Sequence, residues 1–194
     1  MLAITGLNHH FNNKPLFQNY SVCLASTRTC LVAANGRGKT TLFAIIAGLI
    51  KAQSGSLELF GQQLKNANQQ VALASDKIQF PEFLTAKQVI ELVCACWQLP
   101  WPVALITGLS FDIQLNTQVG DLSSGSLKKL QLITALARDV PLTLLDEPSA
   151  ALDETSLQFL LTLLTKRKGQ VIITCHEPDP FVGIGFELQA LDNV

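Results

Sequence analysis

The chain has 194 residues, of which 48% are hydrophobic and 15% charged, and its formal net charge at pH 7 is −1. A chain of this size can bury a full hydrophobic core in one domain. The near-neutral charge argues against a nucleic-acid-binding surface. No apolar run approaches the roughly 20 residues that cross a bilayer, and the first residues lack a secretory signal pattern. We therefore expect one domain at 1–194, located in the cytoplasm.

Taken in chain order, the apolar patterns predict strands that alternate with helices. Residues 1–25 alternate loosely and predict short strands with a turn near 12–15. Short apolar runs predict further strands at 30–32, 56–60, 71–74, 142–145, 171–174 and 186–191. Helical spacing predicts helices after residue 41 and at 86–98, 103–109, 127–138 and 153–167. Such alternation predicts an α/β fold with a mostly parallel central sheet.

The most informative segment runs from Ala33 to Thr41 and reads A-A-N-G-R-G-K-T-T. Because apolar runs flank it, we expect a glycine-rich loop between a strand and a helix, where backbone N–H groups surround a phosphate chain. Lys39 is expected to reach the β- and γ-phosphates, and the Thr40 hydroxyl to ligate Mg²⁺. The alternative is a glycine-rich turn with no ligand. The predicted nucleotide contacts are Ala33, Asn35, Gly36, Arg37, Gly38, Lys39, Thr40 and Thr41.

A second half of a nucleotide site follows the predicted strand at 142–145. Asp146 stands at its end, where a fold with a phosphate-binding loop places another Mg²⁺ ligand. Glu147 is the next residue and is expected to act as a general base toward the attacking water. The alternative is a pair of carboxylates that face solvent at a strand end. The two segments together predict binding and hydrolysis of a nucleoside triphosphate.

The order of the later motifs resembles the ATPase subunits of ABC transporters. The sequence L-S-S-G-S at 122–126 precedes L-T-L-L-D-E-P at 142–148, which is followed by S-A-A-L-D at 149–153 and by His176. The resemblance covers essentially the whole chain. It implies a P-loop NTPase fold with an N-terminal antiparallel β-subdomain and a small helical subdomain at approximately 80–125.

The resemblance also implies roles for single residues. In the family the signature, here 122–126, closes on ATP held by a second subunit, so Ser123 and Gly125 are implied nucleotide contacts. Asp153 is implied to help join the two subunits, and His176 to contact the γ-phosphate. The remaining two implied contacts are Phe11, stacked on adenine unless it belongs to the core, and Thr41, near the α-phosphate.

Besides Ser124, which replaces the commoner glycine of the signature at a position that varies within the family, three positions depart from the family pattern. The first glycine of the phosphate-binding loop is Ala33, which fits if its φ is negative and is strained if φ must be positive. Ser126 replaces the commoner glutamine of the signature. Where the family has a glutamine near Mg²⁺, Asp76 stands at the expected place and Gln79 is the alternative; we favour Asp76 as a metal contact. These departures leave the rate of hydrolysis open.

The resemblance implies an ATPase that powers export through a separate integral membrane permease. The implied cofactors are ATP and Mg²⁺, and the implied assembly is a homodimer or pseudo-dimer at the inner face of the cell membrane, without nucleic acid. The compact chain is similar to the haem-export ATPases of cytochrome c maturation and to ABC-2-type exporters. Phe80, Phe83 and Leu84 are expected either to contact the permease or to form the subdomain's own core. The alternatives are a nucleotide-dependent switch with weak hydrolysis and an ABC protein acting on nucleic acid or ribosomes.

Overall fold

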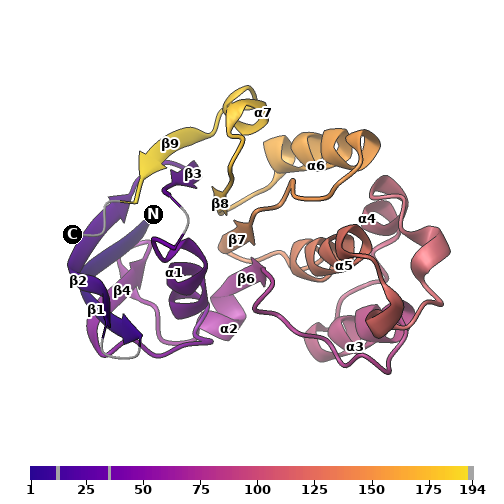
Figure 1. Ribbon diagram of the computed structural model, residues 1–194, viewed down its shortest axis with the longest axis horizontal. Helices are drawn as coiled ribbons and strands as arrows, with labels where there is room; N and C mark the ends of the chain where they lie inside the picture. Colours follow the sequence, from indigo (N-terminus) through magenta and orange to yellow (C-terminus); the bar gives the residue numbers. More distant parts are fainter. Residues whose placement is uncertain (12–13, 35, 192–194) are drawn as a thin grey trace.

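The computed structural model describes residues 1–11, 14–34 and 36–191, with only the backbone of Phe11. Its elements form two sheets flanked by helices (Figure 1). The strands are β1 (Leu2–Phe11), β2 (Lys14–Leu24), β3 (Arg28–Val32), β4 (Ser54–Leu59), β5 (Gln62–Gln63), β6 (Val71–Ala74), β7 (Leu142–Asp146), β8 (Gln170–Thr174) and β9 (Glu187–Ala190). The α-helices are α1 (Lys39–Ile46), α2 (Ala67–Gln70), α3 (Ala86–Trp97), α4 (Val103–Gly108), α5 (Ser124–Leu136), α6 (Glu154–Lys166) and α7 (Asp179–Val182).

The larger sheet has five strands in the order β6-β7-β8-β3-β9, and every neighbouring pair is parallel. Its two faces pack against different layers. Leu144 and Ile172 belong to a cluster with α1 and the antiparallel sheet, whereas the next residues along, Leu145 and Ile173, belong to a cluster with the later helices. This alternation is what a strand buried on both faces requires. The predicted α/β fold with a parallel sheet is confirmed.

The smaller sheet has four strands in the order β2-β1-β4-β5 and is antiparallel throughout. It packs on α1 and supports the loop before that helix. A Cβ atom at Gly38 would lie 3.0 Å from Phe17 Cζ and 3.1 Å from Leu16 Cγ, and Gly38 has φ 90°. Glycine is required here because a larger residue meets both a steric and a conformational obstacle.

The helical region between β6 and β7 contains α3, α4, two 3₁₀ turns at 112–114 and 119–121, and α5. Helix α5 begins at Ser124, three residues earlier than predicted, because the Ser123 hydroxyl accepts the Ser126 N–H and caps the helix. The short elements β5, α2 and α7 were not predicted because two to four residues show no measurable periodicity. Among the described helices, none is long and apolar enough to span a membrane.

Candidate nucleotide-binding site

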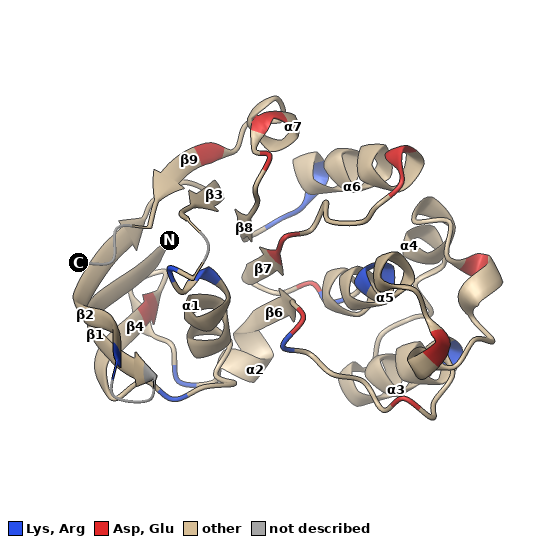
Figure 2. Cartoon of the chain, viewed as in Figure 1, with Lys and Arg blue, Asp and Glu red and all other residues tan. Residues whose placement is uncertain are grey.

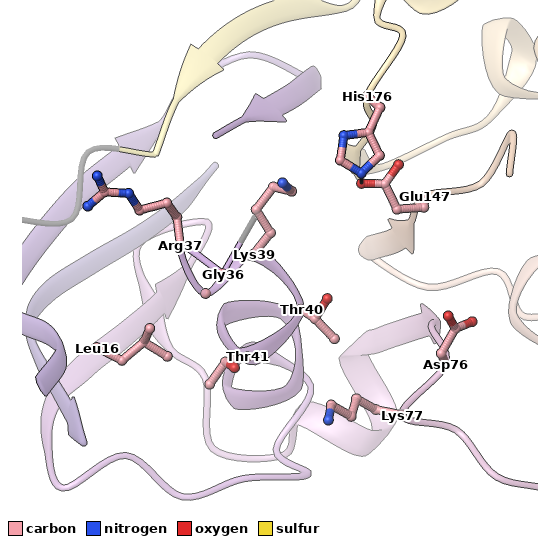
Figure 3. A pocket seen from close by; sticks show the side chains of 11 residues that line it. Leu16, Gly36, Arg37, Lys39, Thr40, Thr41, Asp76, Lys77, Glu147 and His176 are labelled. Atoms are coloured by element: carbon pink, nitrogen blue, oxygen red, sulfur yellow. Dashed lines mark ion pairs between the residues drawn. The ribbon is translucent and has the colours of Figure 1, made fainter. Parts of the chain in front are cut away.

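The carboxyl ends of four parallel strands meet at one edge of the larger sheet. The loops that leave β3, β6, β7 and β8 surround a pocket of about 620 Å³ there (Figure 3). A crevice outside the carboxyl ends of parallel strands is the usual ligand site of such sheets. The lining residues are Leu16, Gly36, Arg37, Gly38, Lys39, Thr40, Thr41, Asp76, Lys77, Glu147 and His176.

The phosphate-binding loop brings the start of α1 to this pocket. Its glycines Gly36 and Gly38 have φ values of 78° and 90°, and Gly38 forms the N-cap of α1 without any side-chain capping bond. The first amides of α1 therefore lack intrahelical acceptors, which is the arrangement that binds anions. The Lys39 side chain is buried, and its Nζ donates to the Ala33 carbonyl at 2.7 Å. The loop thus holds its cation close to its own backbone.

The φ of Ala33 is not positive, so its side chain introduces no left-handed backbone strain into the loop. The first position of the pattern is therefore occupied by alanine without backbone cost.

We expect Ala33→Gly to leave ATP affinity within about twofold of the parent chain and to lower the free energy of unfolding by about 0.5–1 kcal/mol, because glycine adds entropy only to the unfolded chain. Isothermal titration with ATP and urea unfolding measure the two quantities. A gain in affinity of tenfold would show that the alanine distorts the loop after all.

Asp146 is the best-anchored carboxylate of the site. Its side chain is buried, its Oδ2 accepts from Ser75 Oγ at 2.9 Å and its Oδ1 accepts from Thr174 Oγ1 at 2.6 Å. These donors come from residues at the ends of the neighbouring strands β6 and β8. Hydrogen bonds from these two hydroxyls fix the orientation of the carboxylate.

Glu147 leaves the end of β7 in an unusual backbone conformation. It has φ 50°, and its N–H donates to the carbonyl oxygen and to Oγ1 of Thr174, at 3.1 and 3.0 Å. A non-glycine residue in this region costs about 1–3 kcal/mol and is found most often at functional sites. The turn directs the carboxylate into the pocket, where its Oε1 lies 3.5 Å from Nε2 of His176 (Figure 3). The pair can accept a proton and orient a water molecule beside the loop.

Asp76 lies at the third side of the pocket, after β6 (Figure 3). Its carboxylate is 84% exposed, and its Oδ1 lies 2.9 Å from Nζ of Lys128. Lys128 belongs to α5, its side chain is only 7% exposed, and the same Nζ donates to the Asp146 carbonyl at 3.2 Å. The alternative residue, Gln79, is exposed and does not line the pocket; it lines a second cavity of about 550 Å³ with Asp76 and Phe80.

Comparison with known proteins gives the family of this fold and pocket. A family model described as ABC transporter matches residues 17–150. The chain belongs to the ABC transporter family. The ATP-binding protein Uup of Caulobacter vibrioides is 30% identical over 97% of this chain, which spans only 31% of Uup. The cytochrome c biogenesis ATP-binding export protein CcmA of Legionella pneumophila is 29% identical, with 96% of this chain and 98% of CcmA covered.

Solved structures give the same fold. A dimeric ATP-binding cassette in a post-hydrolysis state with ADP and Pi matches with a TM-score of 0.82 and 17% identity, and the match covers 100% of this chain and 95% of the other. The family model and the CcmA match confirm the expected ABC ATPase family, and the solved structures confirm the P-loop α/β fold.

The signature of this ABC chain lies outside the pocket. Neither Ser123 nor Gly125 is among the lining residues. Gly125 instead packs against the loop after β7, since a Cβ atom there would lie 2.6 Å from the Ala151 carbonyl oxygen. That contact alone requires glycine in the single chain.

Asp153 also has intrachain partners. It caps α6 by accepting from Ser156, and its Oδ2 lies 2.5 Å from Nζ of Lys129. The hydrogen bond from Lys129 holds the pKa of Asp153 well below its ordinary value. Its predicted part in joining two subunits stays a prediction.

The donor set fits magnesium in combination with a nucleotide. Thr40 lines the pocket and Asp146 is anchored nearby, and both offer oxygen atoms, which Mg²⁺ prefers. Among the described residues, no group of three or more His, Cys, Asp or Glu side chains is arranged to hold a metal. Phosphate oxygens and water would therefore complete the coordination shell, as is usual for Mg²⁺.

The structure brings most of the predicted site residues together. Gly36 to Thr41, Asp76, Glu147 and His176 all line the pocket. Asn35 lies outside the described residues, and Phe11 ends β1 with its predicted stacking untested. The sequence did not predict that Leu16 and Lys77 line the pocket. It also did not predict the residues that hydrogen-bond to Asp146, which are Ser75, Lys128 and Thr174. Only the parallel register, in which Asp146 pairs with Thr174, reveals the last of these.

Lys and Arg residues are spread over many elements of the described chain (Figure 2). The pocket itself combines cations and anions: Arg37, Lys39 and Lys77 face it together with Asp76 and Glu147. This mixture suits a ligand that carries phosphate groups and a metal ion at once.

Proposed function

We propose that this chain binds ATP with Mg²⁺ in the pocket, that two such chains close on two nucleotides, and that closure and hydrolysis drive a separate integral membrane permease. The observation that supports the proposal best is the convergence of Lys39, Thr40, Glu147 and His176 from three strand ends on one pocket. We further propose that 1–194 is one ATP-binding domain with a helical subdomain at approximately 80–125.

The proposed roles follow from chemistry and position. The amides at the start of α1 and the Lys39 ammonium bind the β- and γ-phosphates, and Thr40 and Asp146 ligate Mg²⁺. When bound, magnesium neutralises charge on the transferred phosphoryl group. Glu147 accepts a proton from the attacking water, and His176 orients this carboxylate and contacts the γ-phosphate.

A second copy completes the site in this proposal. Ser123 is exposed at the start of α5 and Gly125 is partly buried beside it. In the proposed dimer the Ser123 hydroxyl exchanges its hydrogen bonds with Ser126 for the γ-phosphate of ATP held by the other copy, next to the Gly125 amide. A related fold is known as a dimer with ADP and Pi. Asp153, at the start of α6, would lie near the same interface. Either two identical chains or two related domains satisfy this geometry.

The permease contact is proposed around Phe83. This side chain is 75% exposed, whereas Phe80 and Leu84 pack partly buried against the core. A large exposed aromatic residue beside the 550 Å³ cavity suits a partner that inserts a short apolar segment. The similarity to the export protein CcmA supports an export function. The proposed permease contact would hold the chain at the inner face of the cell membrane.

Hydrolysis by a two-chain site has a kinetic signature. We expect Mg²⁺-dependent phosphate release per chain to rise in proportion to protein concentration when the chain is dilute, because two copies must meet before either site is complete. The assay measures phosphate release across a hundredfold dilution series. A constant rate per chain across the series would mean that a single copy hydrolyses ATP alone.

A further inference from the structure

A buried lysine lies next to Asp76 and Asp146, on the side of the pocket where Mg²⁺ is proposed to bind. Lys128 comes two residues after the signature, and its side chain is 7% exposed. Its Nζ lies 2.9 Å from Asp76 Oδ1 and 3.2 Å from the Asp146 carbonyl oxygen. A buried ammonium is tolerated only when it is paired and hydrogen-bonded. Its location is therefore fixed by these two acceptors.

The proposed function makes Asp146 a ligand of Mg²⁺, and Asp76, the further metal contact expected from the sequence, lines the same pocket. Asp76 lines the pocket with an exposed carboxylate side chain. An unpaired carboxylate there would add one negative charge to a site that already contains Asp146 and Glu147. The Lys128 ammonium cancels that charge from the protein side, while the outer part of Asp76 stays exposed to the pocket.

We propose that Lys128 is a positioning residue that compensates the charge of Asp76 and thereby sets the affinity of the site for magnesium. This inference rests on the proposed function, because it requires ATP and Mg²⁺ in this pocket. Asp76 and Lys128 act as one pair of zero net charge. Removing either member alone changes the local charge by one unit, in opposite directions.

The quantity to measure is the metal gain, defined as the dissociation constant of ATP in EDTA divided by that in excess Mg²⁺. In a partly solvated site, a change of one unit charge in this pair is expected to change the metal gain about fivefold. Lys128→Gln should raise the metal gain, because the Asp76 charge is then uncompensated. Asp76→Asn should lower the gain by a similar factor, because the buried ammonium then repels the metal. The double variant should return to the parent value.

Two controls separate charge from structure. Lys128→Arg retains the cation and should keep the parent gain, and Lys87→Gln removes a half-exposed lysine that pairs with Glu91 on the outer side of α3, away from the pocket. A purely structural role for Lys128 would weaken ATP binding equally with and without Mg²⁺, and the ratio would not move. If Lys128→Gln does not fold, the opposite shift in Asp76→Asn still tests the proposal.

An unchanged gain in both single variants, or a shift in the same direction in both, would overturn the proposal. These results leave ATP binding by the parent chain intact and so do not affect the proposed function. A parent chain that binds no ATP in either buffer would overturn the proposed function and this inference together.

Discussion

Replacing Lys39 with alanine should weaken ATP binding about 100-fold, because the phosphates lose a charge-assisted hydrogen bond that contributes up to about 3 kcal/mol. Lys39 is the buried cation of the phosphate-binding loop, and its Nζ already lies 2.7 Å from the Ala33 carbonyl. The nucleotide can thus meet this ammonium without a large rearrangement. Isothermal titration of ATP in the presence of Mg²⁺ measures the loss.

The control for this substitution is Lys51→Ala, which removes an exposed lysine outside the pocket lining. The Lys39 variant should still fold, because the apo chain loses one hydrogen bond worth about 1 kcal/mol. Urea unfolding checks this point. ATP affinity equal to the parent in folded Lys39→Ala protein would show that the triphosphate binds elsewhere.

Replacing Glu147 with glutamine should lower phosphate release by about 100-fold to 10,000-fold, the range that a general base contributes. Nucleotide affinity should change little, since the amide has the same shape and the loop residues that bind phosphate are untouched. The backbone of Glu147 is fixed by two hydrogen bonds from its N–H to Thr174, so the side chain should keep its direction. Steady-state phosphate release and ATP titration separate the two effects.

Glu177→Gln is a matched control, because Glu177 is an exposed carboxylate next to His176 and does not line the pocket. Its phosphate release should equal that of the parent chain. If Glu147→Gln also hydrolyses ATP at the parent rate, another group must activate the water.

Local patterns in the sequence predict the phosphate-binding loop and most of the elements of the parallel sheet. The loop is contiguous, so the spacing of Gly36, Gly38 and Lys39 carries its geometry directly. The strand β7 is an apolar run that ends in Asp146, and burial on both faces produces such runs. Strand β6 was predicted with its observed bounds for the same reason.

The surroundings of the carboxylates were not predictable from local patterns. Asp146 is held by Ser75 and Thr174, which are 71 and 28 residues away in the chain. Lys128 reaches Asp76 across 52 residues. From the sequence alone, a lysine at position 128 indicates only a solvent-exposed position on a helix. The register of the parallel strands is needed to place Ser75, Thr174 and Lys128 around the two carboxylates. The positive φ of Glu147 likewise depends on its bonds to β8.

The molecular mass of purified Glu147→Gln protein in solution, with and without Mg-ATP, decides whether two chains close on ATP. The signature residues Ser123 and Gly125 lie outside the pocket of their own chain, so only a second chain can bring them to the γ-phosphate. We expect a monomer without nucleotide, a dimer with Mg-ATP, and a monomer again in ADP. A protein that binds Mg-ATP and keeps the mass of one chain at all concentrations would contradict this expectation.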